Sequence, residues 1–163
     1  MDSSGTGRWD GYQKKTTVED CLVLSASQLR RRGILRGNAE LGGNCYLRRP
    51  LYGRYDLRIL YWIDTRAGRT GVLCLRYSHP ESGRCYKYNI RLATSIPNFG
   101  GLRWWFICPL VKNGAICGRR ASKLYMPPHS VFFGCRRCYD LTYESCQSQH
   151  IWRRMRRSWW RKG

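Results

Sequence analysis

The sequence predicts an α+β protein: a small antiparallel β-meander domain with N-terminal helices, followed by a zinc-ribbon module and a C-terminal basic helix. Three observations predict this class: alternating, β-branched segments between turn residues in the first half, two cysteine pairs after position 100, and a stretch without Pro or Gly over 139–161. The expected domain boundaries are 1–99, 100–140 and 141–163. A chain of 163 residues fits one domain with a small appended module, which excludes large multidomain enzymes.

Two short helices are expected before the sheet. The segment 16–20 (TTVED) offers hydroxyl groups that can cap free N–H groups and acids that would suit a first helical turn. The segment 27–32 (SQLRRR) should form the second helix, which would end at Gly33 because glycine favours the left-handed position after a helix.

Three strands are then expected over 54–65, 71–78 and 85–93, joined by turns at 67–69 and 79–83. The third strand alternates, so one of its faces should belong to the core and the other should be polar and cationic. A solvated sheet face without any function shows the same alternation. The core face would carry Tyr86, Tyr88, Ile90 and Leu92, and the polar face Lys87, Asn89 and Arg91.

The cysteines after position 100 have the pattern of a zinc ribbon. Cys108 and Cys117 are separated by eight residues, which predicts a turn lengthened by a loop at 112–114. Cys135 and Cys138 form a C-x-x-C pair, in which both thiolates of a tight turn can reach one ion. Two short strands, 123–126 and 130–134, should lie between the pairs. The alternative is a set of ordinary buried thiols.

Four cysteine ligands close the tetrahedral coordination of Zn²⁺, so one structural zinc per chain is expected, without a site for catalysis. Substitute ligands, ranked below the four cysteines, are His129, His150 and Cys146, and Cys146 is expected to pack against the ribbon as a small apolar residue. Buried thiols are expected for the other cysteines, namely Cys21, Cys45, Cys74 and Cys85.

No signal peptide is evident in residues 1–20, which are polar, so a soluble cytoplasmic protein in a prokaryotic cell or phage-infected host is expected. The reducing cytoplasm disfavours disulfides, and nine is an odd number of cysteines. Both points favour metal ligands over a disulfide framework.

The formal net charge of +20 comes from 30 basic and 10 acidic side chains, and residues 82–163 hold 16 of the basic ones but only two acids, a net +14. Such a charge indicates a polyanionic partner such as nucleic acid, with an anionic membrane surface as the competing choice, and composition alone does not decide between the two. Around the cysteines, candidate phosphate contacts are Arg119, Arg120, Lys123, Arg136 and Arg137. An ordinary basic surface is the alternative.

The C-terminal helix, expected from Tyr139 to Arg161, would interleave arginine with tryptophan, which suits phosphate contacts and base stacking. Its candidate contacts are Trp152, Arg153, Arg154, Arg156, Arg157, Trp159, Arg161 and Lys162. Two alternatives remain: an anionic membrane surface, which is disfavoured because the apolar stripe is narrow and contains Ser145 and Ser148, and a helix that docks on the core.

The segment 100–147 (GGLRWWFICP to DLTYESCQ), with TVEDCL at 17–22 and LRRRG at 29–33, resembles a widespread family of uncharacterised bacterial proteins, many carried on phages and other mobile elements. The resemblance covers most of the chain. It implies a zinc ribbon and a prokaryotic or phage setting. No catalytic residues carry over, because the family has no assigned activity.

The resulting hypothesis is a zinc-ribbon nucleic-acid-binding protein of a prokaryotic mobile element, a non-catalytic accessory factor that grips the phosphate backbone of DNA or RNA. A second hypothesis is an interaction protein that recruits or inhibits a larger nucleoprotein complex, such as a recombinase, a polymerase or a host defence effector. A third is a metal-dependent nuclease. It is disfavoured because Asp56, Asp64 and Glu81 are the only acids of the sheet region and the three histidines are scattered.

Overall fold

The computed structural model describes residues 15–48, 56–79, 82–98, 100–128 and 130–147. Most of this chain is antiparallel sheet and little of it is helix, which confirms the coarse α+β prediction. The main sheet has six strands in the order β2-β3-β4-β5-β6-β9. They are β2 (Glu40–Arg48), β3 (Asp56–Asp64), β4 (Thr70–Ser78), β5 (Cys85–Ser95), β6 (Arg103–Ile107) and β9 (Arg120–Ala121).

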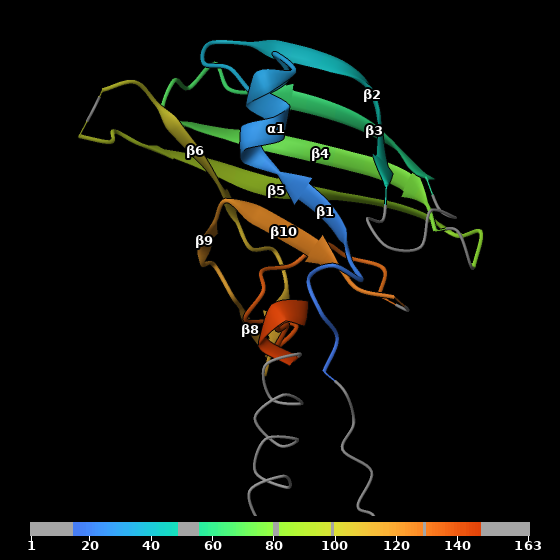
Figure 1. The fold of residues 1–163 in the computed structure, drawn as a ribbon. Helices are drawn as coiled ribbons and strands as arrows, with labels where there is room; N and C mark the ends of the chain where they lie inside the picture. Colours follow the sequence, from blue (N-terminus) through green and yellow to red (C-terminus); the bar gives the residue numbers. More distant parts are fainter. Residues whose placement is uncertain (1–14, 49–55, 80–81, 99, 129, 148–163) are drawn as a thin grey trace, which may run out of the picture.

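The smaller elements lie on one face of this sheet or beside its end. Strand β1 (Leu22–Ser25) pairs with β10 (Lys123–Met126), and this pair lies with α1 (Ala26–Arg31) in front of the six-stranded sheet (Figure 1). A hairpin of β7 (Val111–Lys112) and β8 (Ala115–Ile116) completes the fold. Between the two layers, buried side chains of the sheet, α1, β1 and β10 form one core.

Alternation along the strands explains this layering. On β5, Ile90 and Leu92 are buried whereas Lys87 and Arg91 are exposed, so the predicted division of this strand into two faces is confirmed. Each fully buried aliphatic side chain of this kind contributes about 1.5–3 kcal/mol to folding. The three predicted strands correspond to β3, β4 and β5.

No strand is predicted from the sequence at β2, which runs from Glu40 to Arg48. Gly42 and Gly43 interrupt the alternation there, and glycine is rare in strands. The structure uses Gly43 because the Tyr61 ring lies across it: a Cβ atom at Gly43 would stand 2.8 Å from the Tyr61 hydroxyl oxygen.

The first expected helix, over 16–20, is wrong, whereas the second is confirmed as α1. Thr17 pairs instead with Thr142 in a parallel bridge, and its N–H and hydroxyl both donate to the Asp20 carboxylate, at 3.1 and 2.7 Å. The backbone groups that a helix would use are therefore engaged with the segment after the second cysteine pair. Helix α1 ends as predicted, with Gly33 at φ +69°.

Two predictions for the C-terminal half also need correction. The helix expected from Tyr139 begins only at Glu144, because Asp140 has φ +48° and Thr142 pairs with Thr17. Residues 148–163 lie outside the described part of the chain. The expected strand 130–134 is reduced to one bridge, Gly134 with Tyr125.

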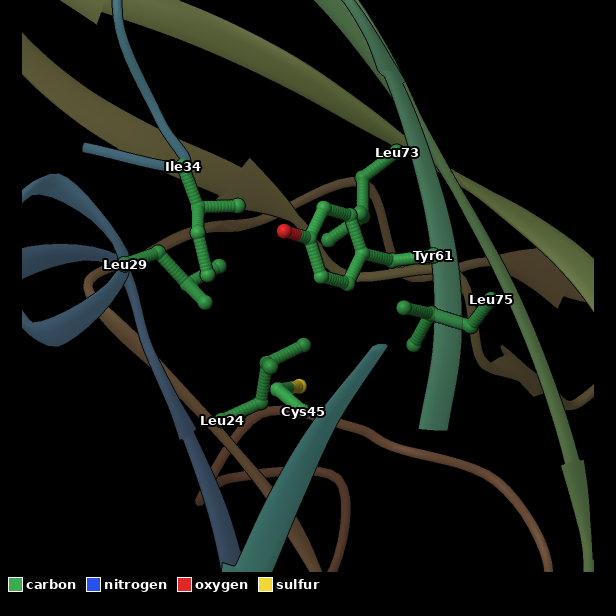
Figure 2. A pocket seen from close by; sticks show the side chains of 7 residues that line it. All are labelled: Leu24, Leu29, Ile34, Cys45, Tyr61, Leu73 and Leu75. Carbon is green, nitrogen blue, oxygen red and sulfur yellow. The ribbon is translucent and has the colours of Figure 1, made fainter. Parts of the chain in front are cut away.

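A narrow apolar gap separates α1 and β1 from the sheet. Figure 2 shows Leu29 and Ile34 facing Tyr61 and Leu73 across it. The gap is too narrow to admit a water molecule. It is therefore an imperfection of core packing rather than a ligand site.

Tyrosine hydroxyls hold the loop 131–133, which leads to the second cysteine pair. Tyr88 accepts a hydrogen bond from the Phe133 N–H at 3.0 Å, Tyr77 donates to the Val131 carbonyl, and Tyr139 donates to the Phe132 carbonyl at 2.5 Å. Burial raises the pKa of Tyr77 and of Tyr139 to about 12 and raises the pKa of Tyr88 further. The core thus positions the backbone that precedes Cys135.

We expect Tyr88→Phe to lower the free energy of unfolding by about 1–3 kcal/mol, because the N–H of the buried Phe133 would lose its acceptor. Denaturant unfolding measures this change. Tyr46→Phe is the matched control: Tyr46 is exposed, so its substitution should stay within about 0.5 kcal/mol of the wild type. Equal losses for the two variants would contradict the role of Tyr88.

Stability should also fall as the pH rises from 10 towards 12. The tyrosine pKa values are raised in the folded state, so the unfolded chain releases protons first and is favoured at high pH. Tyr77→Phe should make this loss less steep by up to about 1.4 kcal/mol per pH unit. Unfolding curves at pH 9, 10 and 11 provide the test, and an unchanged slope would show that Tyr77 does not titrate with folding.

Candidate metal centre

Cys108, Cys117, Cys135 and Cys138 come together at one end of the sheet. Their sulfur atoms all lie within 4.8 Å of one another, with 3.8 Å between Cys108 and Cys138 and 3.8 Å between Cys117 and Cys135. All nine cysteines are free thiols. Among the described residues this is the group of side chains that could hold a metal ion, and it consists of the four predicted ligands.

The first pair stands on two turns joined by the hairpin β7–β8. Strand β6 ends at Ile107, and the Cys108 N–H donates to the Arg119 carbonyl at 2.9 Å, while the Cys117 N–H donates to the Leu110 carbonyl at 2.8 Å. These bonds bring Cys108 and Cys117 side by side although eight residues separate them.

The predicted loop over 112–114 is the tip of this hairpin. Asn113 and Gly114 both have positive φ, at 53° and 78°. This is the conformation of a two-residue turn that joins twisted strands, and Asn-Gly is its preferred sequence. The hairpin therefore lengthens the turn between the two cysteines without moving them apart.

The second pair follows a closely packed glycine. A Cβ atom at Gly134 would lie 2.1 Å from the Leu110 Cδ1 atom and 2.9 Å from the Tyr139 ring. The Cys138 N–H then donates to the Cys135 carbonyl at 3.0 Å, which closes the turn. Sequence reasoning did not single out Gly134; its place directly before C-x-x-C was the available signal.

Backbone N–H groups point at the sulfur atoms. The Cys135 N–H donates to the Cys108 sulfur at 3.2 Å. Burial raises the pKa of Cys108 and of Cys138, and hydrogen bonds from backbone N–H groups partly oppose this for Cys108. For Cys117, burial also opposes ionisation, but the Arg119 N–H and hydrogen bonds from the other thiols lower the pKa overall. A cation between the sulfurs would stabilise all four thiolates at neutral pH.

The other cysteines do not join this group. Cys146 is exposed, so the expectation that it packs as an apolar residue is wrong. Cys21 and Cys45 are buried as expected, Cys74 is half-buried, and Cys85 is exposed because it lies at the end of β5. His129 and His150 lie outside the described residues.

Five predicted phosphate contacts lie in the segments that carry or flank Cys117, Cys135 and Cys138, and all of their side chains are exposed: Arg119, Arg120, Lys123, Arg136 and Arg137. The Arg136 guanidinium lies over the Tyr143 ring, 5.1 Å from its centre. Arg120 belongs to β9 opposite Ile107 and so extends the main sheet. The remaining candidates are outside the described residues: Trp152, Arg153, Arg154, Arg156, Arg157, Trp159, Arg161 and Lys162.

Comparisons with protein families, with curated proteins and with solved structures found no match to this chain. Within the described residues, no helix is both long enough and apolar enough to cross a membrane.

We expect Cys138→Ser to abolish metal binding and to lower the thermal unfolding midpoint, because structural metal sites contribute directly to folding. The wild-type protein should bind one metal ion per chain, measured by elemental analysis of the purified protein. Cys146→Ser is the matched control, since it removes an exposed thiol outside the group, and it should keep the metal. A metal-free wild type that folds normally would contradict the assignment.

Proposed function

We propose that this chain is a nucleic-acid-binding protein of a prokaryotic mobile element, held together by a structural zinc ion and acting as a non-catalytic accessory factor on the phosphate backbone. The observation that carries the proposal is the convergence of four thiols in a stretch, 82–139, that contains no acid and in which five cations near the cysteines in sequence are exposed.

The spacing of the sulfur atoms supports zinc. A tetrahedral zinc ion with Zn–S bonds of about 2.3 Å has sulfur atoms about 3.8 Å apart. Two of the observed separations are 3.8 Å. Cys108, Cys117, Cys135 and Cys138 would hold the ion and would leave no coordination position for a reacting water. Its contribution is therefore to fix the two turns.

Charge counting supports an anionic ligand. Zn²⁺ with four thiolates carries a net charge of −2, which two of the five neighbouring cations would offset. Of the described acids nearby, Asp140 is paired with Lys15 at 2.6 Å. Three of the five cations exceed what the zinc site itself would need, and phosphate groups are anions that arginine binds through two parallel hydrogen bonds.

A second candidate is an interaction protein that docks on a nucleoprotein complex to recruit or inhibit it. One observation favours it. Val111 and Ile116 face each other across the hairpin β7–β8, and each is 63% exposed, which is unusual for a pair of aliphatic side chains. A partner captured specifically after nuclease treatment, and lost in Val111→Ser, would favour this candidate over direct nucleic-acid binding.

A nuclease has less support. Asp64, one of the three acids on which the nuclease hypothesis depends, is held by Arg66 through two hydrogen bonds of 3.0 and 2.7 Å, and this interaction lowers its pKa. The side chains of Asp56 and Glu81 are outside the described part of the structure. Cleavage of labelled DNA or RNA in Mg²⁺ or Mn²⁺, abolished by one acid substitution, would establish the enzyme and overturn the non-catalytic proposal.

We expect affinity for a nucleic-acid oligonucleotide to fall steeply with salt, because each neutralised phosphate releases counterions. The double variant Arg119→Ser, Arg137→Ser, with one change on each cysteine turn, should bind more weakly. It should also reduce the slope of log K against log salt by about 1.4 for a single strand. Fluorescence anisotropy measures both quantities.

The control for this pair is Arg31→Ser, which removes an exposed cation from α1, in the layer in front of the sheet. It should keep the wild-type slope. Affinity that is independent of salt in the wild type, or equal losses for Arg31→Ser and the double variant, would contradict the proposed contacts.

A further inference from the structure

The face of the six-stranded sheet opposite α1, here called the outer face, carries large apolar side chains in solvent. Tyr46 on β2 is 53% exposed, and Leu60 and Trp62 on β3 are 43% and 41% exposed. The inward neighbours Ile59 and Ile63 are fully buried, so alternation alone turns these three side chains away from the core. Within the described residues, no element covers them.

The strand register places the three side chains in one row on the outer face, here called the apolar diagonal. The row crosses from Tyr46 on β2 to Leu60 on β3 and continues along β3 to Trp62. Leu60 is opposite Asn44, two residues from Tyr46, and Trp62 is opposite Gly42. Tyr46 and Trp62 are therefore about 13 Å apart along the strand direction, with Leu60 between them. Gly42 has no side chain, which leaves the indole ring uncovered on the β2 side.

Cations border this diagonal on β3, β4 and β5. Leu60 is opposite Arg76 on β4, and Arg76 is opposite Lys87 on β5. Arg91 follows on the same face of β5, opposite Val72, and Arg58 lies opposite Tyr46. All four cations are exposed, and none of them makes an ion pair with any residue in the described part of the chain.

Acids on the described outer face lie at its end and are already bound. Glu40 and Asp64 face each other across β2 and β3, and Arg66 reaches both, at 2.5 and 2.7 Å. Beside them a hollow of about 490 Å³ opens between Asp64, Arg66 and Arg91. Among the side chains that the structure describes, the middle of the outer face is therefore cationic and aromatic, without an opposing charge.

We propose that the outer face binds single-stranded nucleic acid, with bases stacked on Trp62 and Tyr46 and phosphates bound by Arg76, Lys87 and Arg91. Stacking on aromatic side chains requires exposed base faces, which a single strand offers and a duplex conceals. A protein partner that covered only the apolar diagonal would leave four unpaired cations at its rim. This proposal rests on the proposed function and adds to it a second surface and a class of ligand.

The face is continuous with the metal centre. Arg120, one of the five cations there, lies opposite Ile107 in the sheet, so its side chain shares the outer face with Trp105 and Ile107. One strand of nucleic acid could therefore pass from Trp62 across β4, β5 and β6 to the cysteine turns.

The experiment uses the full chain and 20-nucleotide single strands of DNA and RNA, with a duplex of the same sequence as competitor. We expect Trp62→Ala to weaken binding of the single strand about 5- to 150-fold, which corresponds to the loss of one stacked base. Trp62→Phe should keep most of the affinity, because it keeps a ring. It should also lose part of the fluorescence quenching that the strand causes in the wild type.

Arg76→Ser, on the outer face, should weaken binding and reduce the salt slope, whereas Arg31→Ser on α1 should change neither. Metal content and unfolding curves show whether each variant is folded. If Trp62→Ala lowers stability, Trp62→Phe still tests the contact through its fluorescence change.

Three outcomes would overturn this proposal. The first is binding that survives Trp62→Ala and Arg76→Ser but is lost in the Arg119 and Arg137 double variant. This result would show that the outer face is not the binding surface, and it would leave the proposed function standing. A duplex that competes as well as the single strand would exclude base stacking. No binding of DNA or RNA by the wild type would overturn both proposals, and capture of a protein partner lost in Trp62→Ala would then assign the face to that partner.

Discussion

The constraint on which the rest of the structure depends is the convergence of four thiols in a partly buried site. Cys108 and Cys135 are buried, and the four sulfur atoms lie within 4.8 Å of one another. Burial alone opposes their ionisation, so the site is stable as thiolates only with a cation between them. The positions of these sulfur atoms depend on the turns at the two cysteine pairs, on the hairpin β7–β8 and on Gly134, which has no room for a side chain.

The centre and the sheet stabilise one another through a shared core. Strand β6, which lies between β5 and β9 in the sheet, leads directly to Cys108, and one buried cluster contains Leu92, Phe133 and Cys135. Tyr88 on β5 accepts the Phe133 N–H two residues before Cys135. The N-terminal segment is joined to the segment after Cys138 by the bridge between Thr17 and Thr142. A change in the sheet core should therefore alter the positions of the four cysteines.

The positive charge on the outer face comes from both halves of the chain, although the second half carries most of the net charge. The excess of +14 in the second half indicates a cationic surface near the cysteine turns, and five cations close to the cysteines in sequence are exposed. The first half nevertheless contributes Arg58 and Arg76 to the outer face, next to the second half's Lys87 and Arg91, because β3, β4 and β5 are neighbours. Acids of the first half are used locally, as Glu40 and Asp64 are by Arg66, so they do not neutralise that face.

The sequence by itself determined the features that depend on local spacing. It predicted the alternating strands, the helix that ends at Gly33, and the four cysteines that come together, because alternation, a glycine after a helix and C-x-x-C spacing each act over a few residues. Tertiary structure decided what depends on distant partners. Segment 16–20 is not helical because it pairs with Thr142, and β10 pairs along its whole length with β1 but with 130–134 only through the bridge of Tyr125 and Gly134. Tyr46, Trp62 and Arg76 share one surface only because the strand register aligns three segments, and no local pattern specifies that register.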